Sequence, residues 1–139
     1  MNDRLVICLL SLLASACSSE NRNISAEIAS QFEANTKANI DLRQVGTPTW
    51  DRLCVLLPYS TSDVAEKVLG FKWDAAIGTN EGINVLVFVE GNKVVAYTAH
   101  PRDKGDFSEG GSQCVPRKNA VFSRFVRPGD NWIFLRPAK

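Results

Sequence analysis

His100 is the single histidine of the chain, so any mechanism built on a Ser-His-Asp or Cys-His arrangement has to use it. Asp103 follows closely and many serines are available, but no G-x-S-x-G motif surrounds any of them. A histidine that ends a strand and precedes a proline is typical of exposed polar surface. We therefore expect His100 to be exposed, and a small envelope hydrolase that uses it remains the alternative function.

Acidic residues offer a second kind of chemistry. Glycosidases use two carboxylates about 5 to 10 Å apart. Four acidic residues fall near expected loops, namely Glu81, Glu90, Asp106 and Glu109. The sequence places no two of them at that separation, so they too belong to the hydrolase alternative and we assign no catalytic residue. No cysteine or histidine pair has zinc-site spacing and no phosphate-binding glycine motif is present, so we predict no metal and no cofactor.

The N-terminal segment has the layout of a signal peptide. Arg4 lies in a short polar head, an apolar run covers residues 5–14, and small residues lead up to Cys17. A helix over residues 5–14 would be about 15 Å long, half the thickness of the hydrocarbon core of a bilayer. We expect residues 1–16 to be a cleaved signal peptide, residues 17–23 to form a polar tether and residues 24–139 to fold as one domain.

The segment Leu13-Ala14-Ser15-Ala16-Cys17 resembles the lipobox of bacterial lipoproteins. This resemblance covers the first 17 residues. It implies that Cys17 receives diacylglycerol and becomes the first mature residue, so that the protein is held by lipid on a membrane of the cell envelope. In this family an Asp directly after that cysteine retains the protein in the inner membrane. The residue here is Ser18, which implies the outer membrane where the host has one.

Ordinary secretion is the alternative, because Ala14-Ser15-Ala16 also fits the cleavage rule for a signal peptide without lipid. The cysteine count favours lipidation. Cys8 is lost with the signal peptide and Cys17 takes the lipid, which leaves Cys54 and Cys114. Secretion without lipid would leave an odd thiol in an oxidising compartment. We therefore predict a disulfide between Cys54 and Cys114.

Composition describes a globular domain. Hydrophobic residues make up 45% of the chain and charged residues 22%, which excludes general disorder. The net charge of +1 gives no indication of a nucleic-acid binder. From His100 to Lys139, however, basic residues outnumber acidic residues two to one. This imbalance allows either a basic binding face or ordinary solvated charges.

Two helices and about six strands are expected. Apolar residues at every fourth position predict a helix over residues 24–38 with Ser25 as its cap, and a second helix should begin at residues 60–63 and end at Gly70. The expected strands are residues 40–45, 50–57, 83–89, 94–100, 120–126 and 132–135. Because hairpins join most of these strands, we predict a single small α+β domain with a largely antiparallel sheet. Only the segment 50–89 could add parallel strands.

A long loop is expected over residues 102–118, with Cys114 fixing one end. Loops on a rigid scaffold often carry function. The residues of this loop that we expect to contact a partner are Arg102, Lys104, Phe107, Arg117 and Lys118. The sequence thus predicts a membrane-anchored, non-enzymatic binding or accessory protein whose partner is another protein of the envelope.

Overall fold

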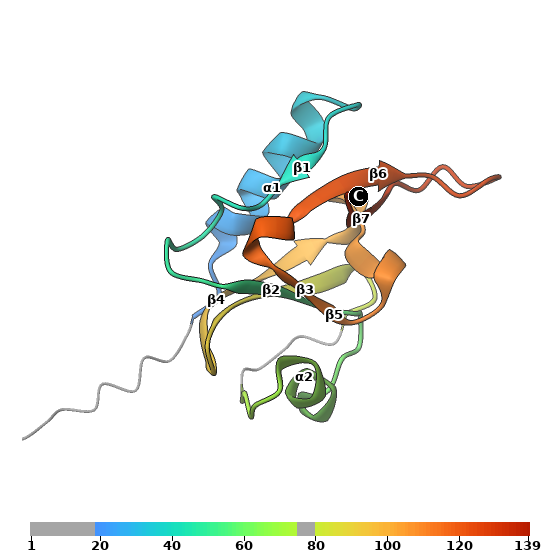
Figure 1. Ribbon diagram of the computed structural model, residues 1–139. Coiled ribbons are helices and arrows are strands. Elements are labelled where there is room, and N and C mark those ends of the chain that lie inside the picture. Colours follow the sequence, from blue (N-terminus) through green and yellow to red (C-terminus); the bar gives the residue numbers. More distant parts are fainter. Residues whose placement is uncertain (1–18, 75–79) are drawn as a thin grey trace, which may run out of the picture.

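A computed structural model describes residues 19–74 and 80–139, and this part of the chain folds as the expected α+β domain (Figure 1). The helices are α1 (Arg22–Ala34) and α2 (Ser62–Leu69). The strands are β1 (Ile40–Asp41), β2 (Arg52–Leu56), β3 (Ile83–Glu90), β4 (Lys93–Pro101), β5 (Gln113–Pro116), β6 (Val121–Phe125) and β7 (Phe134–Pro137). Three short 3₁₀ helices are η1 (Arg102–Lys104), η2 (Phe107–Gly110) and η3 (Arg117–Asn119).

The strands form two antiparallel sheets. One has the order β4-β3-β2-β5 and the other has the order β1-β6-β7. In the described part of the segment 50–89, the expected possibility of parallel strands is not found, because β2 and β3 are direct antiparallel neighbours with Leu53 opposite Phe88. The predicted hairpin of β3 and β4 is confirmed, with its turn at Gly91 and Asn92.

The four-stranded sheet is the middle layer of the domain. Figure 1 shows α1 and the three-stranded sheet on one side of it and α2 on the other. Successive residues of a strand point to opposite faces. Leu53 and Phe88 therefore join the core under α1, whereas Cys54 and Val87 join the core under α2. Burial on both faces explains why β2 and β3 are continuous apolar runs.

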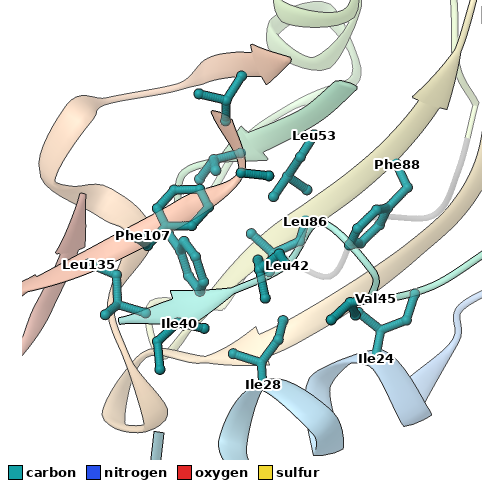
Figure 2. Close-up of a cluster of buried hydrophobic side chains, with 14 of the residues drawn as sticks. Ile24, Ile28, Ile40, Leu42, Val45, Leu53, Leu86, Phe88, Phe107 and Leu135 are labelled. Carbon is teal, nitrogen blue, oxygen red and sulfur yellow. The ribbon is translucent and has the colours of Figure 1, made fainter. Parts of the chain in front are cut away.

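The larger core lies between α1 and the two sheets. Figure 2 shows Ile24 and Ile28 of α1 pointing toward Leu86 and Phe107, all of them fully or almost fully buried. Leu135 of β7 belongs to the same cluster of buried side chains. The repeat of apolar residues along α1 is thus the stripe that covers this core.

Helix α1 differs from its prediction at both ends. It begins at Arg22, because the side chain of Asn21 accepts a hydrogen bond from the Asn23 amide at 3.1 Å and so acts as the cap. The prediction that Ser25 is the cap is wrong. The helix ends at Ala34, since Asn35 has an extended backbone. The second helix is capped by Thr61, one residue after the Ser60 that opens the predicted start signal, and Gly70 caps its C-terminal end as predicted.

The segment 102–118 is not the irregular loop that we predicted. It contains η1, η2 and the strand β5, which pairs with β2 and places Val115 opposite Leu53. The pairing partner lies about 60 residues earlier in the chain, so local sequence pattern could not indicate it. This segment is part of the scaffold.

Two sheet edges are covered by other parts of the chain. The Gln31 side chain of α1 donates to the Asp41 carbonyl at 2.9 Å and accepts from the Asp41 amide at 2.8 Å, as a neighbouring strand would. On the edge of β4, the Asn21 amide donates to the Tyr97 carbonyl at 2.8 Å. Covered edges do not offer free backbone groups to other chains.

Candidate functional site

Cys54 and Cys114 form the predicted disulfide. The two residues lie directly opposite each other on β2 and β5, and their sulfur atoms are 2.01 Å apart. Cys54 is fully buried and Cys114 is partly buried, packed near α2. A bonded sulfur carries no thiolate, so in this state neither cysteine can act as a nucleophile.

His100 is buried, which corrects the prediction that it is exposed. Its ring lies between α1 and η1, and the residue has no exposed surface. Nε2 lies 3.0 Å from the Lys104 carbonyl oxygen, which can only accept a hydrogen bond. Nδ1 therefore accepts from the Ser25 hydroxyl at 2.9 Å. Burial lowers the pKa of His100, although the hydrogen bond to Lys104 and the charge of Asp103 act in the opposite direction.

The contact between Ser25 and His100 is the kind of contact that joins a nucleophile to its general base, but this contact alone does not make a hydrolytic site. Hydrolysis also needs room for a substrate and donors for the developing oxyanion. Three surface clefts formed by the described residues are lined by residues other than Ser25 and His100. The Ser25 hydroxyl instead packs α1 onto the end of β4.

Asp106 is the most buried of the four acidic residues that the sequence singled out, and it organises a small cluster. Its carboxylate accepts from Arg102 Nε at 2.9 Å and from Trp132 Nε1 at 2.8 Å, and it also accepts from the Ser108 amide. Burial raises its pKa, but these hydrogen bonds outweigh burial, so its pKa lies below the usual value. A carboxylate held this firmly in its charged form is suited to structure rather than to proton transfer.

The structure does not bring the five residues of the predicted binding loop together on one surface. Phe107 is 2% exposed and packs in the core, so it cannot contact a partner. Lys104 pairs with Glu33 of α1. Arg117 stacks on Trp50, 4.7 Å from the ring centroid, and donates to backbone carbonyls of the segment 43–50. Lys118 is exposed.

Arg102 is the member of that set that adjoins an exposed aromatic residue. Its guanidinium lies 5.9 Å from the centroid of Trp132, whose side chain is 37% exposed. A surface cleft of about 340 Å³ is lined by Arg102, Asp130, Trp132 and Phe134. The aromatic and basic surface is therefore on the side of β6 and β7.

Between β6 and β7 the chain extends as an arm. We call residues 126–133 the hairpin arm; Figure 1 shows it projecting from the body of the domain. Residues 126–132 are all exposed, and Val126 is 49% exposed. The turn is closed by the Asp130 amide, which donates to the Arg127 carbonyl at 3.0 Å. Aromatic and arginine side chains that are exposed and held in place are the usual anchors of protein interfaces.

Arginine and phenylalanine side chains alternate at the base of the hairpin arm. Phe125 and Phe134 are cross-strand neighbours. Arg136 lies 4.3 Å from the Phe125 centroid, and Arg127 lies 4.3 Å from the Phe134 centroid. The sequence analysis missed this stack. An arginine lies two residues after a phenylalanine on each side of the turn, but the register that brings the two pairs together is not visible in the sequence.

Among residues 19–74 and 80–139, no three His, Cys, Asp or Glu side chains are gathered as metal ligands. No helix of the same residues has the length and apolar character needed to cross a bilayer. Compared with protein families, with curated proteins and with solved structures, the chain matches none.

Proposed function

We propose that this protein is a lipoprotein of the bacterial cell envelope that binds another envelope protein through the hairpin arm and does not catalyse a reaction. The arm carries this proposal, because Val126 and Trp132 are large apolar residues left exposed on a segment that projects from the domain. Exposed apolar residues beside fixed arginines favour an interface.

The anchor of the proposal is Cys17, which lies outside the described residues. The small residues before it and the even pair of cysteines after it support lipidation. Figure 1 places the hairpin arm on the opposite side of the domain from the point at which the described chain begins. A lipid at Cys17 would therefore hold the domain at the membrane and leave the arm free to meet a partner.

Metabolic labelling with a clickable fatty acid tests the anchor. The wild-type protein should be labelled, and Cys17→Ser should not be labelled because no other residue supplies the thioether. Equal labelling of the two proteins would contradict lipidation at Cys17 and favour plain secretion.

Photo-cross-linking in intact envelopes tests the arm. A photoreactive phenylalanine at Trp132 and, separately, at Val126 should capture one and the same protein. The matched control is Tyr59, which is 59% exposed and precedes α2, the helix on the opposite face of the four-stranded sheet from β6 and β7. Adding Arg136→Glu should reduce capture at both arm positions. Equal capture at Tyr59, or different proteins at the two arm positions, would overturn the proposal.

One observation favours the alternative function, a small envelope hydrolase: the Ser25 hydroxyl lies 2.9 Å from His100 Nδ1. Ser25→Ala is its test, since Ser25 is partly exposed and the substitution removes the hydroxyl that contacts the imidazole. Cleavage of acyl esters by the wild type that is lost in Ser25→Ala would establish this function in place of the first.

A further inference from the structure

A surface cleft lies where the described chain begins. It has a volume of about 580 Å³ and is lined by residues 19–23, Thr47 and residues 93–96. The strand β4 and the first turn of α1 form two of its walls. The cleft thus combines the residues that follow the proposed lipid site with the beginning of β4, which directly follows the turn between β3 and β4.

The chain is fixed to the domain from Glu20 onward. The Asn21 amide donates to the Tyr97 carbonyl at 2.8 Å, and Glu20 forms a strand bridge with Tyr97. The Glu20 carboxylate also accepts from the Ala99 amide at 3.4 Å. Residues 20–23, which the sequence placed in a tether, are therefore part of the folded domain.

This attachment leaves little chain between the lipid and the domain. Three peptide units separate Cys17 from Glu20, and a fully extended chain covers at most about 11 Å over that length. The polar headgroup layer on each side of a bilayer is about 5 to 8 Å thick. A lipid on Cys17 would therefore keep the cleft at the level of the headgroups.

We propose that the cleft and the turn between β3 and β4 form the membrane-facing surface of the protein and lie against the headgroups of anionic phospholipids. This inference rests on the proposed lipidation of Cys17. It fixes the orientation of the domain on the bilayer, which lipidation alone does not.

Charge supports the choice of an anionic surface. Lys93 is exposed and has no ion-pair partner among the described residues. The Arg22 side chain is 88% exposed and lies 3.8 Å from Glu20, whose carboxylate is also used by the Ala99 amide. Glu90, on the same turn as Lys93, opposes this attraction. The short tether therefore sets the orientation, and the basic residues add a preference for anionic lipid.

The same orientation places the hairpin arm far from the membrane. Residues 93–96 at the beginning of β4 line the cleft, and Arg102, which follows the end of β4, lies against Trp132 of the arm. Nine strand residues extend about 30 Å. The arm would therefore meet a partner at up to about that distance above the headgroups.

The test uses the full mature lipoprotein in vesicles made of phosphatidylglycerol and phosphatidylcholine, or of phosphatidylcholine alone. A photoreactive residue replaces Asn92 at the turn between β3 and β4 or, as the matched control, Asp130 at the tip of the arm; both positions are exposed. Fatty acid on Cys17 is measured in the same samples. We expect adducts with lipid at position 92 to exceed those at position 130 about tenfold.

Charge reversal tests the headgroup preference. Lys93→Glu should lower lipid adducts at position 92 roughly fivefold in phosphatidylglycerol vesicles and leave them unchanged in phosphatidylcholine. Lys118→Glu, at an exposed lysine outside the cleft, should change neither. Equal adducts at positions 92 and 130 in protein that carries the fatty acid would overturn this orientation while lipidation stands. Protein without fatty acid would overturn both proposals, and an unchanged Lys93→Glu would overturn the preference for anionic lipid.

Discussion

Buried polar side chains are gathered at one end of the larger core. Asn84 and His100 are cross-strand neighbours on β3 and β4, and neither has exposed surface. The Asn84 amide group accepts from the Phe107 amide at 3.0 Å and donates to the Ser108 hydroxyl at 2.9 Å. Because buried polar groups are costly when unpaired, these residues fix the position of the segment 102–110 on the sheet.

Removing the imidazole should remove one component of the pH dependence of stability. Burial lowers the pKa of His100, so between the folded and unfolded values the unfolded chain binds the proton and the folded protein does not. The neutral His100 side chain therefore contributes fully to the free energy of unfolding above the unfolded pKa of about 6.5. This contribution is lost as the pH falls below that value, with a slope of up to about 1.4 kcal/mol per pH unit.

Urea denaturation from pH 7.5 to pH 5 measures this effect. The free energy of unfolding of the wild type should fall below about pH 6.5, and His100→Gln should lack that decrease, although it is less stable at pH 7.5. The chain has one histidine, so no other imidazole contributes. Parallel curves for the two proteins would show that His100 titrates normally in the fold.

The outcome at His100 shows what a local pattern can and cannot predict. The strand over residues 94–100 was predicted correctly, to within one residue at each end, from the Gly-Asn turn before it and from Pro101 after it. The burial of His100 depends on Ser25 and on the Lys104 carbonyl, and Ser25 lies 75 residues away. Partners that the fold brings together do not appear in the residues beside the histidine.

At the scale of elements, the connection from η1 to η2 packs closely against α1 and β7. Gly105 has a φ of +108°, and a Cβ atom built on it would lie 2.6 Å from Leu135 Cδ1 and 3.1 Å from Phe32 Cδ2. Two elements thus approach the backbone at a point where only glycine fits.

Gly105→Ala should destabilise the domain by roughly 2 to 4 kcal/mol, because it adds overlap in the core to backbone strain. The matched control is Gly111→Ala. Gly111 also has a positive φ, of +72°, but a Cβ atom there would meet nothing within 4 Å, so backbone strain of about 1 to 3 kcal/mol is expected alone. Chemical denaturation of the two variants measures the difference. Equal losses would show that packing at Gly105 adds nothing to strain.

Element boundaries were predictable where the signal is local. The hairpin of β3 and β4 and the end of α2 at Gly70 were confirmed, since turn and cap residues act on their own neighbours. The strand β5 was missed because it exists only by pairing with β2. For the same reason Phe107 was taken for a contact residue in a loop, although it is 2% exposed.

At the scale of the whole molecule, the disulfide links the edge strand β5 to the interior of the four-stranded sheet. It spans a sequence separation of 60 residues. In the chain-entropy model a closed loop of that size lowers the entropy of the unfolded chain and so raises its free energy by roughly 4 kcal/mol. This is a large part of the stability of an ordinary domain.

Cys54→Ala combined with Cys114→Ala should therefore lower the free energy of unfolding by roughly 4 kcal/mol. Guanidinium denaturation with and without a reductant measures it. The reductant should lower the stability of the wild type toward that of the double variant and leave the double variant unchanged. A wild type that is insensitive to complete reduction would contradict a stabilising role for the bond.

The α+β class and the antiparallel pairing could be predicted because they depend on element order and on hairpin turns. The division of the strands into two sheets could not, since β1 pairs with β6 over about 80 residues. The arginine and phenylalanine stack depends on the register of Phe125 with Phe134, which the structure supplies. Lipidation at Cys17 remains a prediction of the sequence.

The covered edge of β4 and the pairing of β1 have a consequence for the order of folding. The chain is made from its N-terminus, but Glu20 and Asn21 pair with Tyr97, and Ile40 pairs with Phe122. The first quarter of the domain therefore gains these strand partners only after the third and the last quarters have been made. Such distant pairings slow folding, because a long loop must close before any contact offsets the loss of chain entropy. The domain becomes complete only after nearly all of the polypeptide has emerged.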